Sequence, residues 1–496
     1  MNPALSDHAA AQFHVRVVDL VAHGARFCGL FASATPAGTR VVAVLDRDGD
    51  LRTESVVVPD TAPRYPSLTP DLPAANWYER EIHDLFGVEP VGHPVLDPLV
   101  LPLTPGSTRP RPGSGKVLDP VELDTSPLPG HLRGEGVFTI PYGPVRSGVF
   151  EAVEYVVDTT GEDIPHLRTR IFHKHRGVEV RFEGMSPMDG VLLAERVEGV
   201  ASVAHALAYC GAIEHLAGTE VPGAAGLVRV LHAELERIAN HLDSMIRHTE
   251  AAGQAVAYAR LSLHKERVQR LRARLCGNRF GRGVVIPGGV SGPPMVTPVE
   301  LFAALDEIDQ GLRRDVRLLM ATPSFIDRLR GTGVIPLELA RATAALGPVG
   351  RGSGQVVDTR LDHPYAAYAR LGHLPATPRR EGDALARQHV RIDEIASSVH
   401  VIRQVIDALH DLDPDPTWSV TLEDGLAGET IGWAEAPQGE VLYVVTMDDG
   451  RLVRVKPRSA SFHNLGLFSA AFPKDILTDF AFIEASFGLS IAGVAG

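Results

Sequence analysis

The chain has 496 residues, of which 44% are hydrophobic and 22% charged, and its formal net charge is −13. A chain of this length and composition can bury more than one core, so we expect two or more domains. The acidic balance argues against nucleic acid and anionic lipid surfaces as partners, because both are bound by clustered Lys and Arg.

The sequence contains neither a membrane span nor a secretory signal. No segment reaches the roughly 20 consecutive apolar residues that cross a bilayer, and the amino-terminal MNPALSDHAAAQF lacks a basic segment followed by an apolar run. We therefore expect a cytoplasmic chain with no direct membrane insertion. Cys28, Cys210 and Cys276 are odd in number and widely separated, which predicts reduced thiols.

Residues 1–100 are predicted to form a small α/β domain. Alternation of apolar and polar residues over 14–21 predicts a strand, and the two β-rich runs on either side of DRDGD (46–50) predict a hairpin. Gly49 stands at the fourth position of this loop rather than the sixth, so we expect a solvated turn and not a calcium site.

Residues 101–135 are predicted to be a linker, or an extended arm lying on a partner. Repeated Pro, Gly and Ser in this segment oppose regular hydrogen-bonded structure.

Residues 136–496 are predicted to form a mainly helical-bundle domain with small β subdomains, which makes the whole chain α+β. A hairpin is expected over 136–164 and an extended segment over 168–182. Apolar residues with three- and four-residue spacing predict buried helices over 226–248 and 391–409. Alternation then predicts strands within 429–459, and a helix is expected over 475–487.

The segment NWYEREIHDLFGVEPVGHP (76–94) resembles the signature of the 30-kDa subunit of respiratory complex I. Domains of this kind are also fused to the hydrogenase large subunit in complexes of the formate hydrogenlyase type. The segment is rich in charge but has no positioned nucleophile or pair of metal ligands, so we interpret it as a docking surface rather than a catalytic centre.

The larger domain resembles the large subunit of membrane-bound, energy-converting nickel–iron hydrogenases and its counterpart, the 49-kDa subunit of complex I. The resemblance rests on motifs that occur in order, namely HRGVE (175–179), ERVEGVAS (195–202), ELERIANHL (234–242), HPYAAY (363–368), EAPQGE (435–440) and SFGLSIAG (486–493). It implies a soluble-arm subunit of a membrane-associated redox complex, peripheral on the inner face of the cytoplasmic membrane. The implied partners are a small iron–sulphur subunit and antiporter-like membrane subunits.

The resemblance also implies a metal site, which this sequence lacks. In hydrogenases two CxxC pairs hold nickel and iron, and the four matching positions here are Glu198, Ala201, Ser490 and Gly493. Thiolates bind these metals, and Ala and Gly have no side-chain donor. We therefore expect no metal, no hydrogenase activity and no cofactor bound by this chain, with iron–sulphur clusters only in a partner.

Quinone binding remains an alternative. In complex I, a tyrosine after the ER motif and histidines on the hairpin contact the quinone head group, and the matching positions here are Gly199, Phe150 and Arg146. Neither polar contact of the family is retained, which weakens quinone binding without excluding it.

Five charged residues are expected around the former cavity and are candidates for a proton relay: His175, Arg176, Glu179, Glu198 and His205. The favoured alternatives are a structural ion pair between Glu179 and Arg176 and a satisfied histidine in a helix core for His205. His173 and His175 would share one face of an extended segment, which predicts a polar face more than a metal site.

Three functions are consistent with these features. The first is a subunit that couples electron transfer in its partners to a membrane arm. The second is a quinone-reducing subunit of the NADH-quinone oxidoreductase type with altered quinone contacts. The third is an assembly scaffold without chemistry of its own.

Overall fold

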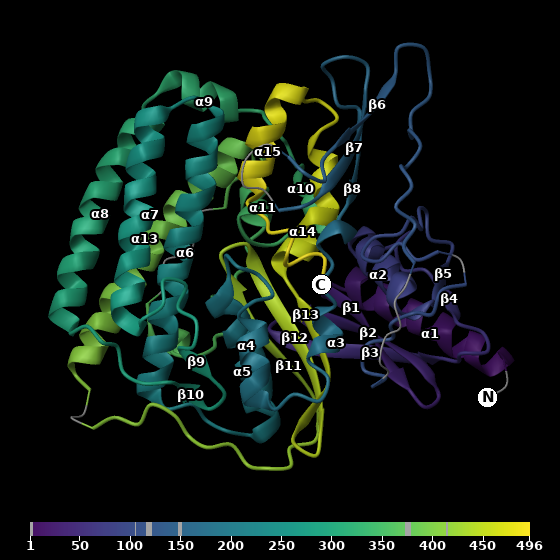
Figure 1. The fold of residues 1–496 in the computed structure, drawn as a ribbon, viewed down its shortest axis with the longest axis horizontal. Coiled ribbons are helices and arrows are strands. Elements are labelled where there is room, and N and C mark those ends of the chain that lie inside the picture. The colour runs from purple at the N-terminus through teal and green to yellow at the C-terminus, as the bar shows by residue number, and fades with distance from the viewer. Residues whose placement is uncertain (1–2, 105, 116–121, 147–150, 373–377, 413–414) are drawn as a thin grey trace.

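The computed structural model describes residues 3–104, 106–115, 122–146, 151–372, 378–412 and 415–496 (Figure 1). It has the α+β fold class expected from the sequence. None of the helices in these ranges is both long enough and apolar enough to cross a membrane.

The amino-terminal part is built on one antiparallel sheet. Strands β1 (Arg26–Thr35), β2 (Gly38–Arg47) and β3 (Asp50–Val58) pair in that order, and helix α1 (Pro3–Ala22) packs against them. The predicted hairpin is confirmed, because Arg47 pairs with Asp50 across a two-residue turn. Both turn residues, Asp48 and Gly49, have positive φ angles, as a type I′ turn requires.

The predicted strand over residues 14–21 is wrong, because this segment lies inside α1. Phe13 and Val17 are fully buried four residues apart, as on one helix face. The Ala-rich residues before them extend the helix, so the alternation over 14–21 had too few residues to distinguish the two periods.

A second group of short elements completes this part of the chain. Strands β4 (Arg64–Pro66) and β5 (Glu89–Val91) pair in parallel, and the 3₁₀ helix η1 (Pro73–Ala75) leads into α2 (Asn76–Phe86). Helix α2 ends at Gly87, whose left-handed conformation terminates it.

The described part of the linker lies on the chain itself. The backbone N–H groups of Gly113 and Gly115 donate to the carboxylate of Glu183, and that of His131 donates to Asp158. The backbone N–H of Arg111 donates to the carbonyl of Leu85 in α2. The segment is therefore an extended arm that contacts both the amino-terminal part and the larger domain, with almost no regular structure.

The larger domain begins with an antiparallel sheet of β6 (Phe138–Tyr142), β7 (Glu154–Thr159) and β8 (His166–Arg170). The pairing of β6 with β7 confirms the hairpin. The extended segment predicted over 168–182 is correct only to Arg170, because η2 (Phe172–Lys174) and α3 (Val178–Arg181) follow. Gly177 separates these two turns in a left-handed conformation.

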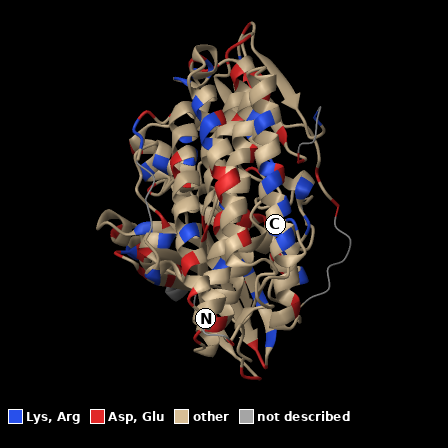
Figure 2. Ribbon diagram, turned by 90° about the vertical axis from the view of Figure 1, so that its left-hand side faces the viewer, with Lys and Arg blue, Asp and Glu red and all other residues tan. Residues whose placement is uncertain are grey.

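The bundle consists of α6 (Gly223–Ala251), α7 (Ala255–Cys276), α8 (Pro298–Met320) and α13 (Ala384–His410), which stand together at the left of Figure 1. The helices predicted over 226–248 and 391–409 are confirmed inside α6 and α13. Their apolar stripes enter one core shared by the four helices. Figure 2 shows acidic and basic residues intermixed on the outer face.

The predicted strands within 429–459 form a three-stranded antiparallel meander, β11 (Gly428–Ala436), β12 (Gly439–Asp448) and β13 (Arg451–Arg458). Helix α5 (Ser202–Ala217) crosses β11 so closely that a Cβ atom at Gly432 would meet the helix backbone. The remaining elements are α4 (Pro187–Ala194), β9 (Val285–Ile286), β10 (Gly289–Val290), α9 (Pro323–Leu329), α10 (Leu337–Ala342), α11 (Gly347–Gly352), α12 (Thr359–Asp362), η3 (Tyr368–Arg370), α14 (Ala460–Phe468), η4 (Ser469–Ala471), η5 (Leu477–Asp479) and α15 (Phe480–Phe487).

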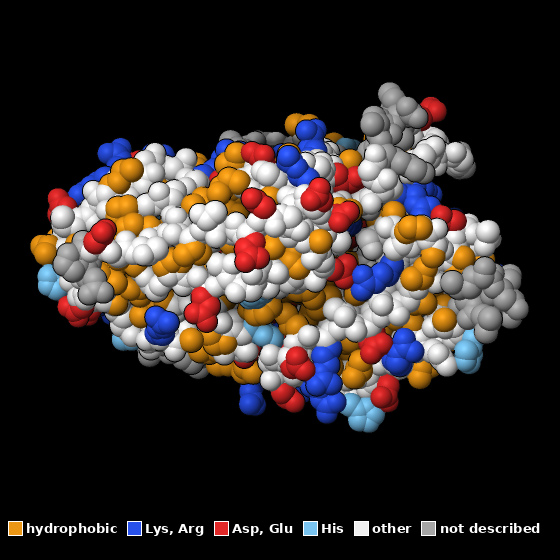
Figure 3. Space-filling view, turned by 90° about the horizontal axis from the view of Figure 1, so that it is seen from below, with side chains coloured by type: hydrophobic (Ala, Val, Ile, Leu, Met, Phe, Trp, Pro, Cys, Tyr) orange, Lys and Arg blue, Asp and Glu red, His pale blue; other side chains and the backbone are white. Residues whose placement is uncertain are grey.

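The amino-terminal part packs against the larger domain through a continuous core. Tyr78 of α2 contacts Phe462 of α14, with ring centroids 5.0 Å apart, and both belong to a hydrophobic cluster that reaches from α1 to α15. The carboxyl-terminal residues lie at this junction, near α3 and α14 in Figure 1. On the lower face, hydrophobic side chains occur in several areas separated by acidic and basic groups (Figure 3).

Candidate functional site

The four positions that match the hydrogenase cysteines, which we call the former socket, come from two distant segments. Glu198 and Ala201 lie between α4 and α5, and Ser490 and Gly493 lie after α15. The fold brings the segments into contact, because a Cβ atom at Gly493 would lie 2.9 Å from Cδ of Glu198. The side chain of Glu198 therefore fills the space beside Gly493.

Both carboxylate oxygens of Glu198 have partners. The hydroxyl of Ser461 donates to Oε1 at 2.6 Å, and Nε2 of His205 lies 3.1 Å from Oε2. Nδ1 of His205 is 2.8 Å from the hydroxyl of Tyr443. His205 is fully buried and both ring nitrogens have partners, as expected for a satisfied histidine in a helix core.

Ser490, another position of the former socket, is also hydrogen-bonded within the protein. The hydroxyl of Ser490 donates to Glu151 at 3.0 Å, and its backbone N–H donates to Ser461 at 3.1 Å. Ala201 is completely buried. One carboxylate and one hydroxyl, both hydrogen-bonded, do not fit a nickel–iron centre that needs four thiolates. Among the described residues, no cluster of three or more His, Cys, Asp or Glu side chains could hold a metal ion.

Arg176 connects the two segments of the former socket. Its guanidinium donates to the backbone carbonyls of Arg196, Val197 and Ala492 at 2.6 to 2.8 Å. Burial lowers its pKa from the ordinary value for arginine. Nδ1 of the neighbouring His175 lies 2.7 Å from the carbonyl of Ala495, and burial lowers the pKa of this imidazole.

The prediction that Glu179 pairs with Arg176 is wrong, because Glu179 binds two other cations. The carboxylate of Glu179 lies 2.6 Å from the guanidinium of Arg454 and 2.6 Å from Nζ of Lys456, both on β13. Burial raises the pKa of Glu179, but the two cations outweigh burial and lower this pKa to about 2. Glu179 is therefore an ionised partner in a structural cluster, apart from Glu198 and His205.

Lys456 also binds Glu81 of α2, with Nζ 2.7 Å from both carboxylate oxygens. We call Glu81, Glu179, Arg454 and Lys456 the junction cluster, because α2 belongs to the amino-terminal part and β13 to the larger domain. The docking surface expected in the segment 76–94 thus contacts the chain's own β13. The neighbouring acids of α2 are also internal, because Glu79 and Asp84 are buried and accept hydrogen bonds from backbone N–H groups.

Strand β13 carries the cations that sequence reasoning missed. Arg454, Lys456 and Arg458 alternate along the strand and are all buried. Arg458 bonds to Glu440, and Arg26 of β1 lies 2.7 Å from the same carboxylate. Alternating cations between apolar residues in RLVRVKPR were the available signal, since one strand face then carries only positive charge.

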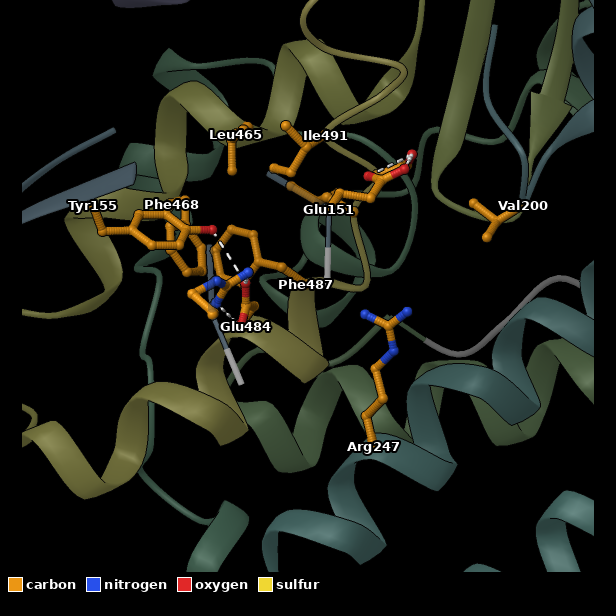
Figure 4. A pocket seen from close by; sticks show the side chains of 12 residues that line it. Glu151, Tyr155, Val200, Arg247, Leu465, Phe468, Glu484, Phe487 and Ile491 are labelled. Atoms are coloured by element: carbon orange, nitrogen blue, oxygen red, sulfur yellow. Dashed lines mark hydrogen bonds and ion pairs between the residues drawn. The ribbon is translucent and has the colours of Figure 1, made fainter. Parts of the chain in front are cut away.

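The candidate quinone positions are separated in the structure. Phe150 lies outside the described residues. Gly199 is exposed, and a Cβ atom there would meet nothing within 4 Å. Arg146 forms two 2.9 Å hydrogen bonds with Glu484 and lines a cavity of about 120 Å³ (Figure 4).

This cavity adjoins the former socket. Figure 4 shows Glu151, Val200 and Arg247 on one side and the rings of Tyr155, Phe468 and Phe487 on the other. Ser490 also lines it, so the cavity and the former socket share a wall.

His173 and three aromatic side chains of the larger domain also have partners within the protein. His173 lies 3.6 Å from Glu154, and the indole of Trp433 donates to the carbonyl of His363. The hydroxyl of Tyr365 accepts the backbone N–H of Glu435, and Tyr368 donates to Glu234.

Comparison with known proteins agrees with this geometry. Residues 5–110 match the family described as the 30 Kd subunit of respiratory-chain NADH dehydrogenase, residues 252–423 and 423–495 match its 49 Kd subunit, and residues 176–244 match nickel-dependent hydrogenases. An NADH-quinone oxidoreductase subunit of Deinococcus radiodurans is 30% identical over 69% of this chain and 92% of that protein. The chain belongs to the family of complex I 49-kDa subunits and hydrogenase large subunits.

Other relatives match a larger share of the chain. Formate hydrogenlyase subunit 5 of Escherichia coli is 29% identical over 83% of this chain and 73% of its own length. An NADH-quinone oxidoreductase subunit of Gluconacetobacter diazotrophicus is 28% identical over 90% of this chain and 82% of its own length. Both support the resemblance of this member of the family to a fused 30-kDa and 49-kDa chain.

We expect Gly493→Ala to destabilise the chain by about 1–3 kcal/mol, because the new methyl group overlaps the carboxylate of Glu198. In a Glu198→Ala background the same change should cost almost nothing. A double-mutant cycle measured by denaturant unfolding tests this, and additive effects of the two changes would contradict the contact.

We expect Glu179→Gln to lower the free energy of unfolding by about 3 kcal/mol at neutral pH, because it removes the carboxylate that neutralises the buried Arg454 and leaves Lys456 with Glu81 alone. A carboxyl group whose pKa is lower in the folded than in the unfolded chain stabilises the fold at pH values above its unfolded-state pKa. This stabilisation is lost as the pH falls toward the folded-state pKa. The difference between wild type and variant should therefore narrow between pH 4.5 and about 2.

The matched control is Glu266→Gln, since Glu266 also has a pKa near 2 but binds Arg270 and Arg279 on the exposed face of the bundle. Solvent screens such a pair, so we expect a smaller loss there. Equal losses in the two variants would show that burial of Glu179 has no energetic consequence.

Proposed function

We propose that this chain is a peripheral-arm subunit of a membrane-associated redox complex related to complex I and to energy-converting hydrogenases. In this proposal it has no nickel–iron centre and couples electron transfer in partner subunits to a membrane arm. The redox cofactors are then iron–sulphur clusters of a partner.

The former socket carries this proposal. Glu198 takes the place of one thiol, fills the space beside Gly493 and uses both carboxylate oxygens within the protein. A thiolate-bound metal needs the volume that this carboxylate takes and donors that the four positions lack. Proton transfer through Glu198 and His205 stays a prediction, supported by their direct contact.

The proposed partners follow from the family. We propose a small iron–sulphur subunit next to the former socket and antiporter-like subunits in the membrane, with the chain on the cytoplasmic face. We also propose the domain division 1–100, 101–135 and 136–496. The continuous core between α2 and α14 supports packing of the first domain on the third.

The metal content of the native complex tests the proposal. A complex purified through a tag on this chain should contain iron and acid-labile sulphide from its partner and far less than one nickel per chain. A relative with four cysteines at the socket positions, purified in parallel, is the control for nickel retention. One nickel per chain, or no co-purifying iron–sulphur subunit, would overturn the proposal.

A second candidate function is quinone reduction, and the 120 Å³ cavity favours it. Aromatic and aliphatic side chains line the cavity together with four charged side chains, Arg146, Glu151, Arg247 and Glu484. Apolar walls combined with polar groups that can orient a ligand are features of a small-molecule site. Under this alternative a quinone ring would lie between Tyr155 and the loop at Val200.

Filling the cavity distinguishes this alternative from the first proposal. Val200→Trp should lower the affinity for a short-chain benzoquinone at least tenfold, because the indole takes part of the cavity. Val299→Trp, at a well-exposed position on α8, is the matched control and should leave affinity unchanged. Titration calorimetry on the purified complex measures both, and wild-type affinity in Val200→Trp contradicts quinone binding in this cavity.

The third candidate, an assembly scaffold, differs from the first proposal in that the chain takes no part in proton translocation. In a correctly assembled complex, a scaffold tolerates Glu198→Gln without change in proton translocation.

A further inference from the structure

The junction cluster distributes its charges unequally. Glu179 has two cations within 2.6 Å, whereas Lys456 is the only cation that contacts Glu81 among the described residues, and it is shared with Glu179. Both carboxylates are almost completely buried. The two acids and two cations make a neutral group, in which Glu81 is the carboxylate with the weaker compensation.

A cavity gives this group a route to solvent. It has a volume of about 240 Å³ and lies between α2, the linker and α3. Glu81 and Glu179 both line it, and most of the remaining wall is apolar, from Leu85, Val100, Pro110 and Val178. A space of this size holds several waters, which can carry a proton to a carboxylate in its wall.

We propose that Glu81 is a proton-binding residue that exchanges its proton through this cavity, and that its charge sets the strength of the contact between α2 and β13. Protonation converts the carboxylate to a neutral carboxyl group and changes the net charge of the cluster from zero to +1. Lys456 then has one ionised partner, Glu179, and the ion pair between α2 and β13 is lost.

The surrounding charges agree with this role. Burial raises the pKa of Glu81, and the negative charge of Glu179 raises it further, against the opposing effect of Lys456 and Arg454. The other titratable or charged groups near the cluster are His175 and Arg176, which also line the cavity, and Asp84, one turn along α2. Asp84 is held by the backbone N–H groups of residues 99–101.

The inference concerns the isolated chain and does not depend on the proposed redox partners. A negative result for the nickel analysis or the quinone titration would therefore leave the proposed role of Glu81 intact. Likewise, a negative result for Glu81 would leave the proposed function intact.

Infrared spectroscopy of the full-length chain tests it by detecting protonated carboxyl groups as pH is varied between about 5 and 9. Burial also raises the pKa of Glu195, Glu236 and Glu435, so the Glu81 band is identified by difference between two spectra. We expect the difference between the wild type and Glu81→Gln to contain one buried carboxyl band that titrates. Asp84→Asn, which removes the other buried carboxyl group of α2 with a raised pKa, should retain this band. A difference spectrum without a titrating band, or loss of the same band in Asp84→Asn, would overturn the proposal.

A second variant keeps the test decisive if Glu81→Gln does not fold. Glu179→Gln removes the neighbouring negative charge and leaves both cations to Glu81, so the midpoint of the band should fall by about 1–3 pH units. An unchanged midpoint contradicts the shared cluster.

Val180→Phe narrows the cavity and should slow hydrogen–deuterium exchange of the carboxyl group, and an unchanged rate would exclude this cavity as the route.

Discussion

Neutralisation of buried carboxylates by the cations of β13 is the constraint on which the arrangement of the two domains depends. Isolated buried charges are costly, so each acid at the junction requires a partner. Lys456 and Arg458 meet Glu81 and Glu440, and Arg26 reaches Glu440 from the amino-terminal sheet. Because these cations alternate on one strand, a shift of the strand by one residue would turn all of them away from their acids. The ion pairs therefore fix the register of β13 together with the position of α2.

In the former socket, too, a buried carboxylate has partners within the protein. A metal held by four thiolates joins two segments of the chain, and in this protein hydrogen bonds perform that structural role. Ser461 links Glu198 to the backbone of Ser490, and Arg176 binds carbonyls of both segments. Glu198 and Gly493 depend on each other, since the carboxylate fits only where no Cβ atom is present. The missing thiols are thus part of a repacked interior rather than isolated losses.

Local periodicity explains how much could be predicted from the sequence. Helices α6 and α13 were found because their apolar residues repeat over about five turns or more, and the hairpin at Asp48 and Gly49 because its turn chemistry is specific. Residues 14–21 were assigned wrongly because eight residues fit either period. In the site, the order of the family motifs assigned Glu198 and Gly493 to one former metal site. The partners of Glu179 lie some 280 residues away, and no local sequence pattern indicates them. Long-range charge pairing is set by the tertiary fold, which the sequence pattern does not contain.

The segment 175–179 joins the two sites physically. His175 and Arg176 bind the carbonyls of Ala495 and Ala492 beside the former socket, whereas Glu179 faces the junction cluster. The left-handed turn at Gly177 makes this possible, because it reverses the direction of the side chains within three residues. A displacement of the carboxyl-terminal segment must therefore move α3 or break the bonds to Arg176. A contiguous set of packed and hydrogen-bonded groups can carry coupling between two sites, and the segment that connects these two is five residues long.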